Sequence, residues 1–269
     1  MRLPTLMHIF VAGCAGYIGS VLVPLLLEAG HRVTVLDRFF FGPTLAAAER
    51  VHGERLRLVR GDTRTFDGAL LAGVDGVCDL AGISNDPSCE IEPELTSSVN
   101  VEGGKRLARL AREAGVRRYV YSSSCSVYGH GEGQGLTESS PRNPVSLYAR
   151  TKVELEDTLL AMGRPGGAPR STGGGAGPFE VVLLRLATVF GLAPRMRFDL
   201  AVNVMTKNAY VHRRITVDGG GRQWRPFVHI RDVAEAFRVA LTAEASAVSG
   251  QVFNVGAASG NVRILNLAF

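Results

Sequence analysis

The chain has 269 residues, of which 46% are hydrophobic and 20% are charged, with a net charge of +5. It is too apolar for an intrinsically disordered protein, and it is long enough to bury the core of one large domain. The longest clean apolar run, residues 21–27, is far shorter than the roughly 20 residues that a membrane span needs, and the first residues lack the pattern of a signal peptide. We therefore expect a cytoplasmic protein with no membrane partner.

The small positive excess and the cysteines exclude two further classes of function. Arginines alternate with acidic residues on the periodic stretch 93–114, which is typical of a solvated helix face rather than a nucleic-acid surface. The four cysteines, Cys14, Cys78, Cys89 and Cys125, form no CxxC pair and have no histidine at metal-ligand spacing. We expect free thiols in a reducing compartment, no bound metal and no nucleic-acid partner.

Short apolar runs alternate with amphipathic stretches over the first 190 residues. The runs predict strands at residues 8–12, 32–36, 55–59, 76–80, 118–122 and 180–186. The stretches between them predict helices at 18–29, 93–114 and 146–162. Strands that are apolar on both faces and alternate with helices indicate an α/β fold with a doubly wound parallel sheet.

This alternation changes in two places. Residues 163–178 are rich in Gly and Pro and predict a flexible surface loop. After Gly191 we expect helices at 199–210 and 232–243 and strands at 215–217 and 226–230. We predict a large domain over residues 1–190 and a smaller lobe over 191–269, some of whose segments return to the main sheet.

A glycine-rich turn joins the first strand to the first helix. Gly13 permits a tight turn, Gly16 lets the backbone approach a pyrophosphate at the helix N-terminus, and Gly19 lets helix and strand pack closely. Asp37 ends the second strand, where a carboxylate binds the adenosine ribose hydroxyls and repels a 2′-phosphate. The sequence therefore predicts a dinucleotide site that prefers NAD, and the neighbouring Arg38 leaves NADP open.

A tyrosine and a lysine four residues apart form the candidate catalytic pair. Tyr148 and Lys152 share one helix face, and a nearby ammonium and a positive nicotinamide ring both lower the pKa of a phenol toward that of a usable base. Ser122–Ser124 end the fifth strand, at the sheet edge where ligands bind in doubly wound folds. A serine hydroxyl at that edge can bind the reacting oxygen.

These motifs, in this order and with GxxGxxG spacing, resemble the extended short-chain dehydrogenase/reductases, within them the nucleotide-sugar epimerase/dehydratase family and its UDP-glucose 4-epimerases. The resemblance covers roughly residues 7–267. It implies a Rossmann domain that binds NAD, a nucleotide-diphosphate sugar as substrate, and a homodimer formed through the helices at 93–114 and 146–162. Family members usually extend further, so we expect the lobe over 191–269 to be an incomplete substrate-binding lobe.

The resemblance also implies roles for individual residues. On the cofactor side it adds a set of residues to the three glycines, Asp37 and Arg38, namely Tyr17, Ile18, Asp62, Thr63, Leu80, Ala81, Gly82, Asn100, Ser122, Tyr148 and Lys152. Asp62 corresponds to an aspartate near the adenine amine, and Asn100 to an asparagine that steadies the central sheet beside the cofactor. The implied substrate contacts are Ser124, which is also the catalytic hydroxyl, Thr188, Asn203 and Arg225, the last corresponding to an arginine that binds the diphosphate.

Four positions depart from the family pattern. Sugar 4,6-dehydratases carry an Asp-Glu pair directly after the catalytic hydroxyl, whereas Cys125 and Ser126 stand there in this chain. A thiol and a hydroxyl are an inefficient acid and base at neutral pH, so dehydration ranks below epimerisation. Thr188 replaces a frequent asparagine, and Pro226 replaces the aspartate that usually follows the diphosphate-binding arginine.

We expect NAD-dependent epimerisation at C4 of a nucleotide-diphosphate sugar. Tyr148 would deprotonate the C4 hydroxyl that Ser124 orients, while Lys152 would keep Tyr148 ionised and bind the nicotinamide ribose. Hydride would pass to NAD and return to the other face of the 4-keto sugar after the sugar rotates. Two alternatives remain open: an NAD(P)-dependent 4-keto-sugar reductase or sugar dehydratase, and a regulatory or structural protein that binds NAD without turnover.

Overall fold

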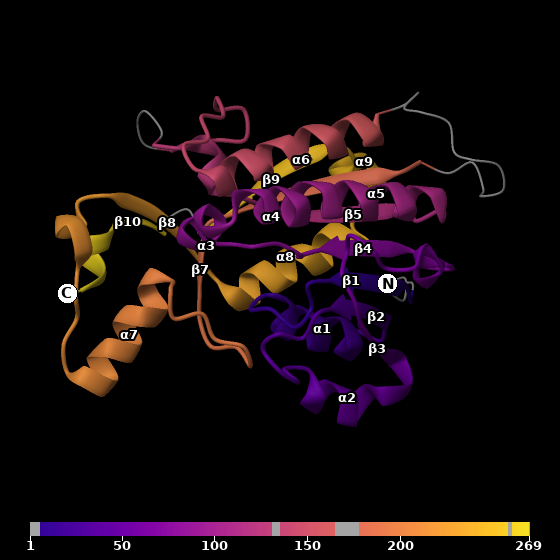
Figure 1. The fold of residues 1–269 in the computed structure, drawn as a ribbon, viewed down its shortest axis with the longest axis horizontal. Coiled ribbons are helices and arrows are strands. Elements are labelled where there is room, and N and C mark those ends of the chain that lie inside the picture. The colour runs from indigo at the N-terminus through magenta and orange to yellow at the C-terminus, as the bar shows by residue number, and fades with distance from the viewer. Residues whose placement is uncertain (1–5, 131–134, 165–177, 258–259, 269) are drawn as a thin grey trace.

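A seven-stranded parallel β-sheet forms the centre of the computed structural model, which describes residues 6–130, 135–164, 178–257 and 260–268 (Figure 1). Its strands are β1 (His8–Ala12), β2 (Arg32–Asp37), β3 (Leu56–Arg60), β4 (Gly76–Asp79), β5 (Arg118–Ser124), β6 (Glu180–Leu186) and β9 (Gln251–Val255). Their order in the sheet is β3-β2-β1-β4-β5-β6-β9, and every adjacent pair is parallel. The order reverses direction between β1 and β4, so the predicted doubly wound sheet is confirmed, with its switch point at the end of β1.

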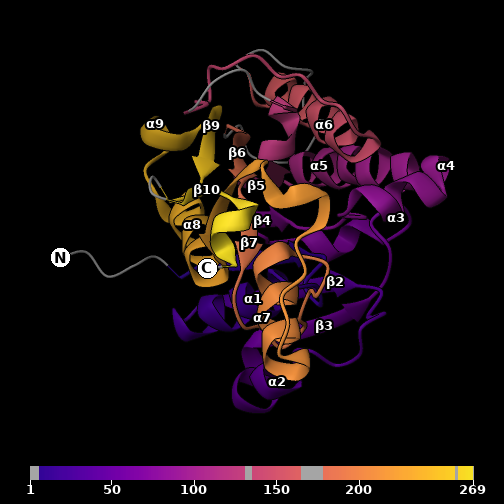
Figure 2. The same cartoon turned by 90° about the vertical axis from the view of Figure 1, so that its left-hand side faces the viewer.

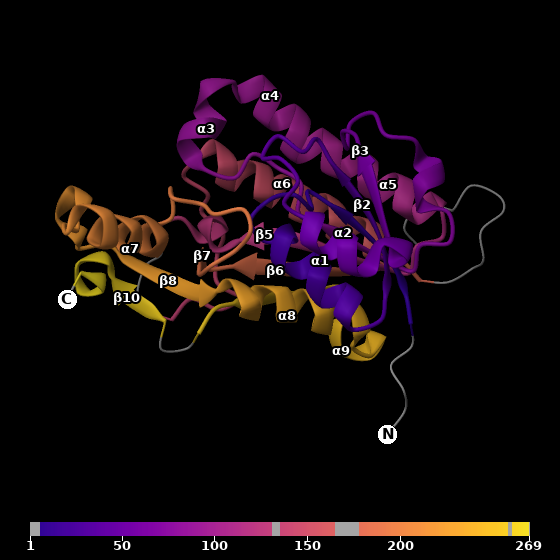
Figure 3. The same ribbon diagram turned by 90° about the horizontal axis from the view of Figure 1, so that it is seen from below.

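Helices cover both faces of this sheet (Figures 1 and 3). One face carries α1 (Gly19–Glu28), α2 (Ala46–His52), α8 (Ile230–Thr242) and α9 (Ala245–Val248), and the other carries α5 (Gly103–Glu113) and α6 (Leu147–Gly163). In α8 the buried residues Ile230, Val233, Phe237 and Leu241 recur at helical spacing and pack against α1 and the sheet. Inner strands such as β1 and β6 are almost wholly buried, because both of their faces are covered, whereas the edge strands β3 and β9 are partly exposed.

The predicted helix at 93–114 is present but divided. α3 (Asp86–Ile91) precedes α4 (Pro93–Ser97), a π-helical turn η3 (Ser98–Glu102) follows, and α5 continues the same run. Such a turn widens the helix by one residue locally. It carries Asn100 and Val101, both buried, toward the loop that follows β4.

A second, three-stranded sheet forms a small lobe beside the carboxyl ends of the main strands, and Figure 2 faces this lobe. It contains β7 (Thr188–Phe190), β8 (Trp224–His229) and β10 (Asn261–Arg263), with α7 (Ala201–His212) and the 3-10 turns η5 (Asp218–Gly221) and η6 (Ile264–Leu267). β7 and β8 are parallel, and β10 pairs with β8 antiparallel. Met205, Phe227 and Ile264 form the lobe's own buried core.

Several sequence expectations need correction or fall elsewhere. The predicted strand at 215–217 is wrong: Ile215 and Val217 pack against the core of the lobe, but no neighbouring strand pairs with them. The sequence did not predict α2, α3, α9, β7, β9 or β10. The flexible loop expected over 163–178 lies mostly in 165–177, outside the described residues.

Candidate active site

A cavity of about 1250 Å³ opens at the carboxyl ends of β1, β2, β4 and β5, between the main sheet and the small lobe. Parallel sheets bind ligands at this edge, next to the switch point. The volume exceeds the range of roughly 300–1,000 Å³ that one small ligand usually occupies. The cavity therefore has room for a dinucleotide together with a second molecule.

The glycine-rich turn forms the floor of the cavity at the end of β1. Gly13 adopts a φ of +76°, and a Cβ there would lie 2.7 Å from the backbone nitrogen of Ala81. A Cβ on Gly19 would overlap the backbone carbonyl of Cys14. Both positions therefore require glycine. Gly16, Tyr17 and Ile18 line the cavity at the N-terminus of α1, so the chain offers the cradle and helix dipole that a pyrophosphate needs.

Asp37 lies at the carboxyl end of β2, on the rim of the same cavity. Its Oδ2 accepts a hydrogen bond from the Ala15 amide at 2.9 Å, and its Oδ1 accepts one from the Phe39 amide at 2.7 Å. The carboxylate is thus fixed against the glycine turn, where a ribose hydroxyl would meet it. The residues present fit an NAD molecule at this edge.

Arg38 and Asp62 contact each other rather than standing free. Their side chains pair at 3.1 Å, and Arg64 binds the same carboxylate at 2.7 Å. The hydrogen bonds from Arg64 lower the pKa of Asp62 to about 2, against the opposing effect of burial. Because Arg38 is held by Asp62, its charge at this rim is partly neutralised.

The other expected cofactor residues divide into two groups. Thr63, Leu80, Ala81, Gly82 and Ser122 line the cavity. Asn100 does not line it, because it is buried. Its Oδ1 accepts a hydrogen bond from the Ile83 backbone N–H at 2.7 Å, and its Nδ2 donates to the Ile83 carbonyl at 2.9 Å. It also donates to the Thr151 hydroxyl at 3.3 Å, so it joins the loop after β4 to α6.

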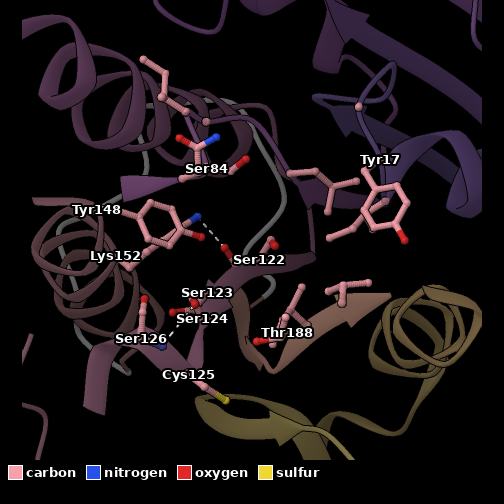
Figure 4. A pocket seen from close by; sticks show the side chains of 18 of the residues that line it. Tyr17, Ser84, Ser122, Ser123, Ser124, Cys125, Ser126, Tyr148, Lys152 and Thr188 are labelled. Carbon is pink, nitrogen blue, oxygen red and sulfur yellow. Dashed lines mark hydrogen bonds between the residues drawn. The ribbon is translucent and has the colours of Figure 1, made fainter. Parts of the chain in front are cut away.

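Ser124, Tyr148 and Lys152 converge at the end of β5 (Figure 4). Ser146 caps α6 by accepting a hydrogen bond from the Ala149 amide, which places Tyr148 in the first turn, beside the cavity. The Lys152 ammonium donates to the Ser122 carbonyl at 2.7 Å and lies 5.6 Å from the centre of the Tyr148 ring. The helix spacing that the sequence predicted therefore brings phenol, ammonium and hydroxyl together.

Burial opposes ionisation of both members of the pair. It raises the pKa of Tyr148 to about 12, although Arg197 and a hydrogen bond with Ser124 act in the other direction. Burial also lowers the pKa of Lys152 to about 8, while the carboxylates of Asp79 and Glu156 raise it. With the protein groups alone, Tyr148 therefore keeps its proton at neutral pH, and most Lys152 side chains are charged.

A buried ion pair supports this region from below, and the sequence reasoning missed it. Glu156 follows Lys152 by one helical turn, is fully buried, and pairs with Arg185 of β6 at 2.7 Å. Glu156 also accepts a hydrogen bond from the Ser123 hydroxyl at 2.5 Å, and Arg185 donates to the Tyr128 hydroxyl at 2.8 Å. The pair thereby connects α6 with the strand end that carries Ser124.

The two residues after Ser124 offer no carboxylate. Burial raises the pKa of the Cys125 thiol to about 12, and the thiol donates to the Arg185 carbonyl at 3.4 Å. The Ser126 hydroxyl is buried without a hydrogen-bond partner in the described part of the chain. Neither side chain is suited to exchange protons with a substrate at neutral pH.

The small lobe forms part of the cavity wall. Thr188 and Arg225 line it as expected. Arg195 and Arg197, from the segment between β7 and α7, line it as well and were not among the expected site residues. Arg197 pairs with Asp199 at 2.5 Å, so its charge is partly neutralised. Two guanidinium groups beside a cavity still suit an anionic ligand, and the Pro-Arg-Met-Arg string was the available sequence signal.

Asn203 is the expected substrate contact that the structure places elsewhere. It is 5% exposed and lies outside the cavity lining. Its amide group contacts Gly191, Tyr17 and the Arg197 backbone. Tyr17 itself lines the cavity, but its hydroxyl points away from Tyr148 (Figure 4). These two polar groups therefore bind protein rather than ligand.

The described residues show neither a metal-binding cluster nor a membrane-spanning helix. No group of three or more His, Cys, Asp or Glu side chains in that part of the chain could hold a metal ion. None of the helices there is long and apolar enough to cross a membrane.

Comparisons with known proteins identify the family. Residues 9–256 match the model of the NAD dependent epimerase/dehydratase family. A UDP-glucose 4-epimerase of Mycolicibacterium smegmatis is 32% identical over 255 residues, which are 93% of this chain and 77% of that protein. The structure of MoeE5 in complex with UDP-glucose and NAD superposes with a TM-score of 0.79 at 29% identity, covering 97% of this chain and 79% of MoeE5. DesIV, a dTDP-glucose 4,6-dehydratase of Streptomyces venezuelae, gives 0.80 at 27% identity, covering 97% and 79%. The chain belongs to the NAD dependent epimerase/dehydratase family.

Proposed function

We propose that this enzyme epimerises a nucleotide-diphosphate sugar at C4, with NAD as its cofactor. The carrying observation is that Ser124, Tyr148 and Lys152 meet at one end of a cavity large enough for cofactor and sugar nucleotide. The UDP-glucose 4-epimerase of M. smegmatis supports a uridine nucleotide as the first substrate to test.

NAD in this cavity supplies a group that accepts a hydride and returns it. The chain's own residues handle the proton. Tyr148 accepts the proton of the C4 hydroxyl, and the Ser124 hydroxyl binds the C4 oxygen. The Ser126 amide donates to Ser124 Oγ at 3.2 Å and so fixes that hydroxyl. General base catalysis of this kind contributes about 10²–10⁴-fold in rate.

Lys152 makes Tyr148 usable as a base. With Lys152 in place, a phenol with a pKa of about 12 is still protonated at neutral pH, so its ionisation also needs the positive nicotinamide ring that NAD would bring. The Lys152 ammonium adds to that charge, and its contact with the Ser122 carbonyl fixes it 5.6 Å from the centre of the Tyr148 ring. Asp79 and Glu156 favour the charged form of Lys152 against burial. Asp79 and Glu156 therefore favour ionisation of Tyr148 indirectly, by keeping Lys152 charged.

The arginines of the small lobe provide the binding energy for the nucleotide. Arg225 on β8 is exposed at the cavity, and Arg195 and Arg197 lie on the segment before α7. Guanidinium groups bind phosphate oxygens with charge-assisted hydrogen bonds. The diphosphate would be held there, with the sugar directed toward Tyr148.

Cys125 and Ser126 favour epimerisation over dehydration. Elimination of water needs an acid and a base at the sugar, and neither the high-pKa thiol nor the buried hydroxyl provides one. Dehydratases are nevertheless among the similar structures, so the assay must separate the two reactions.

The test uses the purified protein with UDP-glucose and no added reduced cofactor. Epimerisation gives a product of unchanged mass and inverted configuration at C4, whereas dehydration gives a product lighter by one water and a keto-sugar reductase gives no turnover. Tyr148→Phe should lower turnover about 10²–10⁴-fold while bound NAD is retained. Unchanged turnover in Tyr148→Phe would contradict the mechanism.

We also propose that the enzyme is a cytoplasmic homodimer that pairs through α4–α5 and α6. These helices lie side by side on one face, where Leu95 of α4 and Ile91 at the end of α3 are exposed. Light scattering of the purified protein tests the dimer, and cell fractionation tests the location.

A further inference from the structure

Residues 191–199, here called the 191–199 segment, connect β7 to α7 and carry Arg195 and Arg197 to the cavity. Three loops of the main sheet contact this segment, one after β1, one after β2 and one after β4. The segment belongs to the small lobe in sequence, yet it is attached to the cofactor-binding edge of the sheet.

The strongest of these contacts is a buried polar link between Tyr17 and Asn203. The Tyr17 hydroxyl donates to the Gly191 carbonyl at 2.5 Å and accepts from the Asn203 amide at 3.0 Å. Asn203 accepts from the Gly191 amide at 3.1 Å and donates its other proton to the Arg197 carbonyl at 3.0 Å. Tyr17 and Asn203 thereby bind the backbone of the segment at Gly191, and Asn203 also binds it at Arg197.

The link has little freedom to rearrange. Tyr17 and Asn203 are each 5% exposed, and the two amide protons and the amide oxygen of Asn203 are all used. At Gly191 the chain has a φ of +117°, and a Cβ there would lie 2.5 Å from the His229 ring. A buried polar network in which every member is satisfied specifies one arrangement.

Ala193 and Met196 of the segment also pack against the main core, whereas its remaining polar contacts are more exposed. Arg195 lies 3.8 Å above the ring of Phe41, Arg197 donates to the Ser84 carbonyl at 3.4 Å, and Asn85 donates to Asp199 at 3.3 Å. Surface contacts of this kind contribute little individually. We therefore assign these exposed contacts a smaller part in fixing the position of the segment than the buried link.

Tyr17 belongs to the glycine turn, because it stands between Gly16 and Gly19. A pyrophosphate bound by the turn would restrain its backbone, and the rigid ring of Tyr17 would carry that restraint to Gly191 and, through Asn203, to Arg197. We propose that Tyr17 and Asn203 are positioning residues through which NAD bound at the glycine turn holds the 191–199 segment, with Arg195 and Arg197, at the cavity. The use of those arginines for a nucleotide diphosphate rests on the proposed function, whereas the coupling to NAD does not.

Amide hydrogen exchange with and without NAD tests the coupling directly. In the wild type, NAD should slow exchange at residues 13–20 and also at the 191–199 segment. Tyr17→Phe keeps the ring and removes the hydroxyl, so NAD should still protect residues 13–20, while its effect on the segment should fall about tenfold. The matched control is Tyr210→Phe, an exposed tyrosine of α7, which should behave as the wild type.

Equal protection of the segment in the wild type and Tyr17→Phe would overturn the proposal, as would a wild-type segment that does not respond to NAD. If Tyr17→Phe does not fold, Asn203→Ser removes the same link from the other side and carries the same expectation and the same refuting result.

Binding of uridine diphosphate to the NAD-loaded proteins gives a second readout. Tyr17→Phe should weaken this binding about tenfold, and the loss should vanish in the background of Arg197→Met, because Tyr17 acts through that arginine. Additive losses in the double variant would overturn the proposed route through Arg197. A wild type that binds NAD but no uridine diphosphate would instead refute the proposed substrate, and the exchange experiment would still decide the coupling.

Discussion

Replacing Lys152 by methionine should stabilise the fold while it removes activity. The Lys152 side chain is 6% exposed, and burial lowers its pKa from 10.5 to about 8, although Asp79 and Glu156 favour the charged form. The folded state therefore holds an ammonium at neutral pH that water would solvate better. Methionine has a similar length and no charge to desolvate.

The size of the effect follows from the pKa. One pKa unit corresponds to about 1.4 kcal/mol, so the change from 10.5 to about 8 corresponds to about 3 kcal/mol of cost for the charged form. Methionine also loses the hydrogen bond to the Ser122 carbonyl, worth about 1 kcal/mol. At pH 7 we expect Lys152→Met to raise the free energy of unfolding by about 2 kcal/mol.

The pH dependence has a definite sign. Because the pKa of Lys152 is lower in the folded than in the unfolded state, the unfolded chain binds more protons between about pH 8 and pH 10.5. The stability of the wild type should rise with pH through that window relative to the variant. The difference in the free energy of unfolding between the variant and the wild type should therefore narrow as the pH increases from 8.

Urea unfolding of the nucleotide-free proteins, followed by circular dichroism at pH 7 and about pH 9.5, measures this gap. Other groups that titrate in this pH range, such as the buried thiols, affect the free energy of unfolding of both proteins equally, so their contribution cancels in the difference between wild type and variant. Lys105→Met on α5 is the control, since Lys105 is paired with Glu154 at 2.7 Å near the surface and should give no gain. A variant that is less stable than the wild type at pH 7, or a gap that does not change with pH, would refute the reasoning.

Three further substitutions test the support, the cofactor turn and the substrate side. Glu156→Gln leaves the buried guanidinium of Arg185 without its compensating negative charge and should cost about 3–5 kcal/mol in urea unfolding; a loss below about 1 kcal/mol would show that the ion pair is dispensable. Gly19→Ala places a methyl against backbone and should deplete the NAD released on denaturation, while Gly53→Ala, which meets nothing within 4 Å, should not; equal NAD content would contradict the close packing of the turn. Arg225→Met should raise the KM for the sugar nucleotide about tenfold or more at unchanged NAD content, and an unchanged KM would remove Arg225 from the binding site.

Most of the main sheet could be predicted because its strands are apolar on both faces, as in Glu180–Leu186, where all seven residues are buried. β9 was not predicted because its sequence, Gln251–Val255, mixes polar and apolar residues, which is typical of a strand at the sheet edge. The strand expected at 215–217 has the right composition, but no partner strand lies beside it. Pairing is a tertiary property that a short apolar run does not encode.

The site shows the same division. The positions of Tyr148 and Lys152 follow from a helical spacing of four, and that of Ser124 from its place at a strand end. The surroundings of Asn203 could not be predicted, because its partner Tyr17 is 186 residues away in the sequence. Contacts of this range arise only when the small lobe folds back onto the main sheet.

Whether the hydrogen at C4 of the sugar is kept during turnover tests the central claim most directly. The enzyme is incubated with UDP-glucose deuterated at C4, without added cofactor, and the product is analysed by NMR. Inversion at C4 with the deuterium retained on that carbon is the predicted result, because the hydride that leaves C4 is returned to the same carbon. Formation of a product lighter by one water, or loss of the deuterium to solvent, would contradict the account.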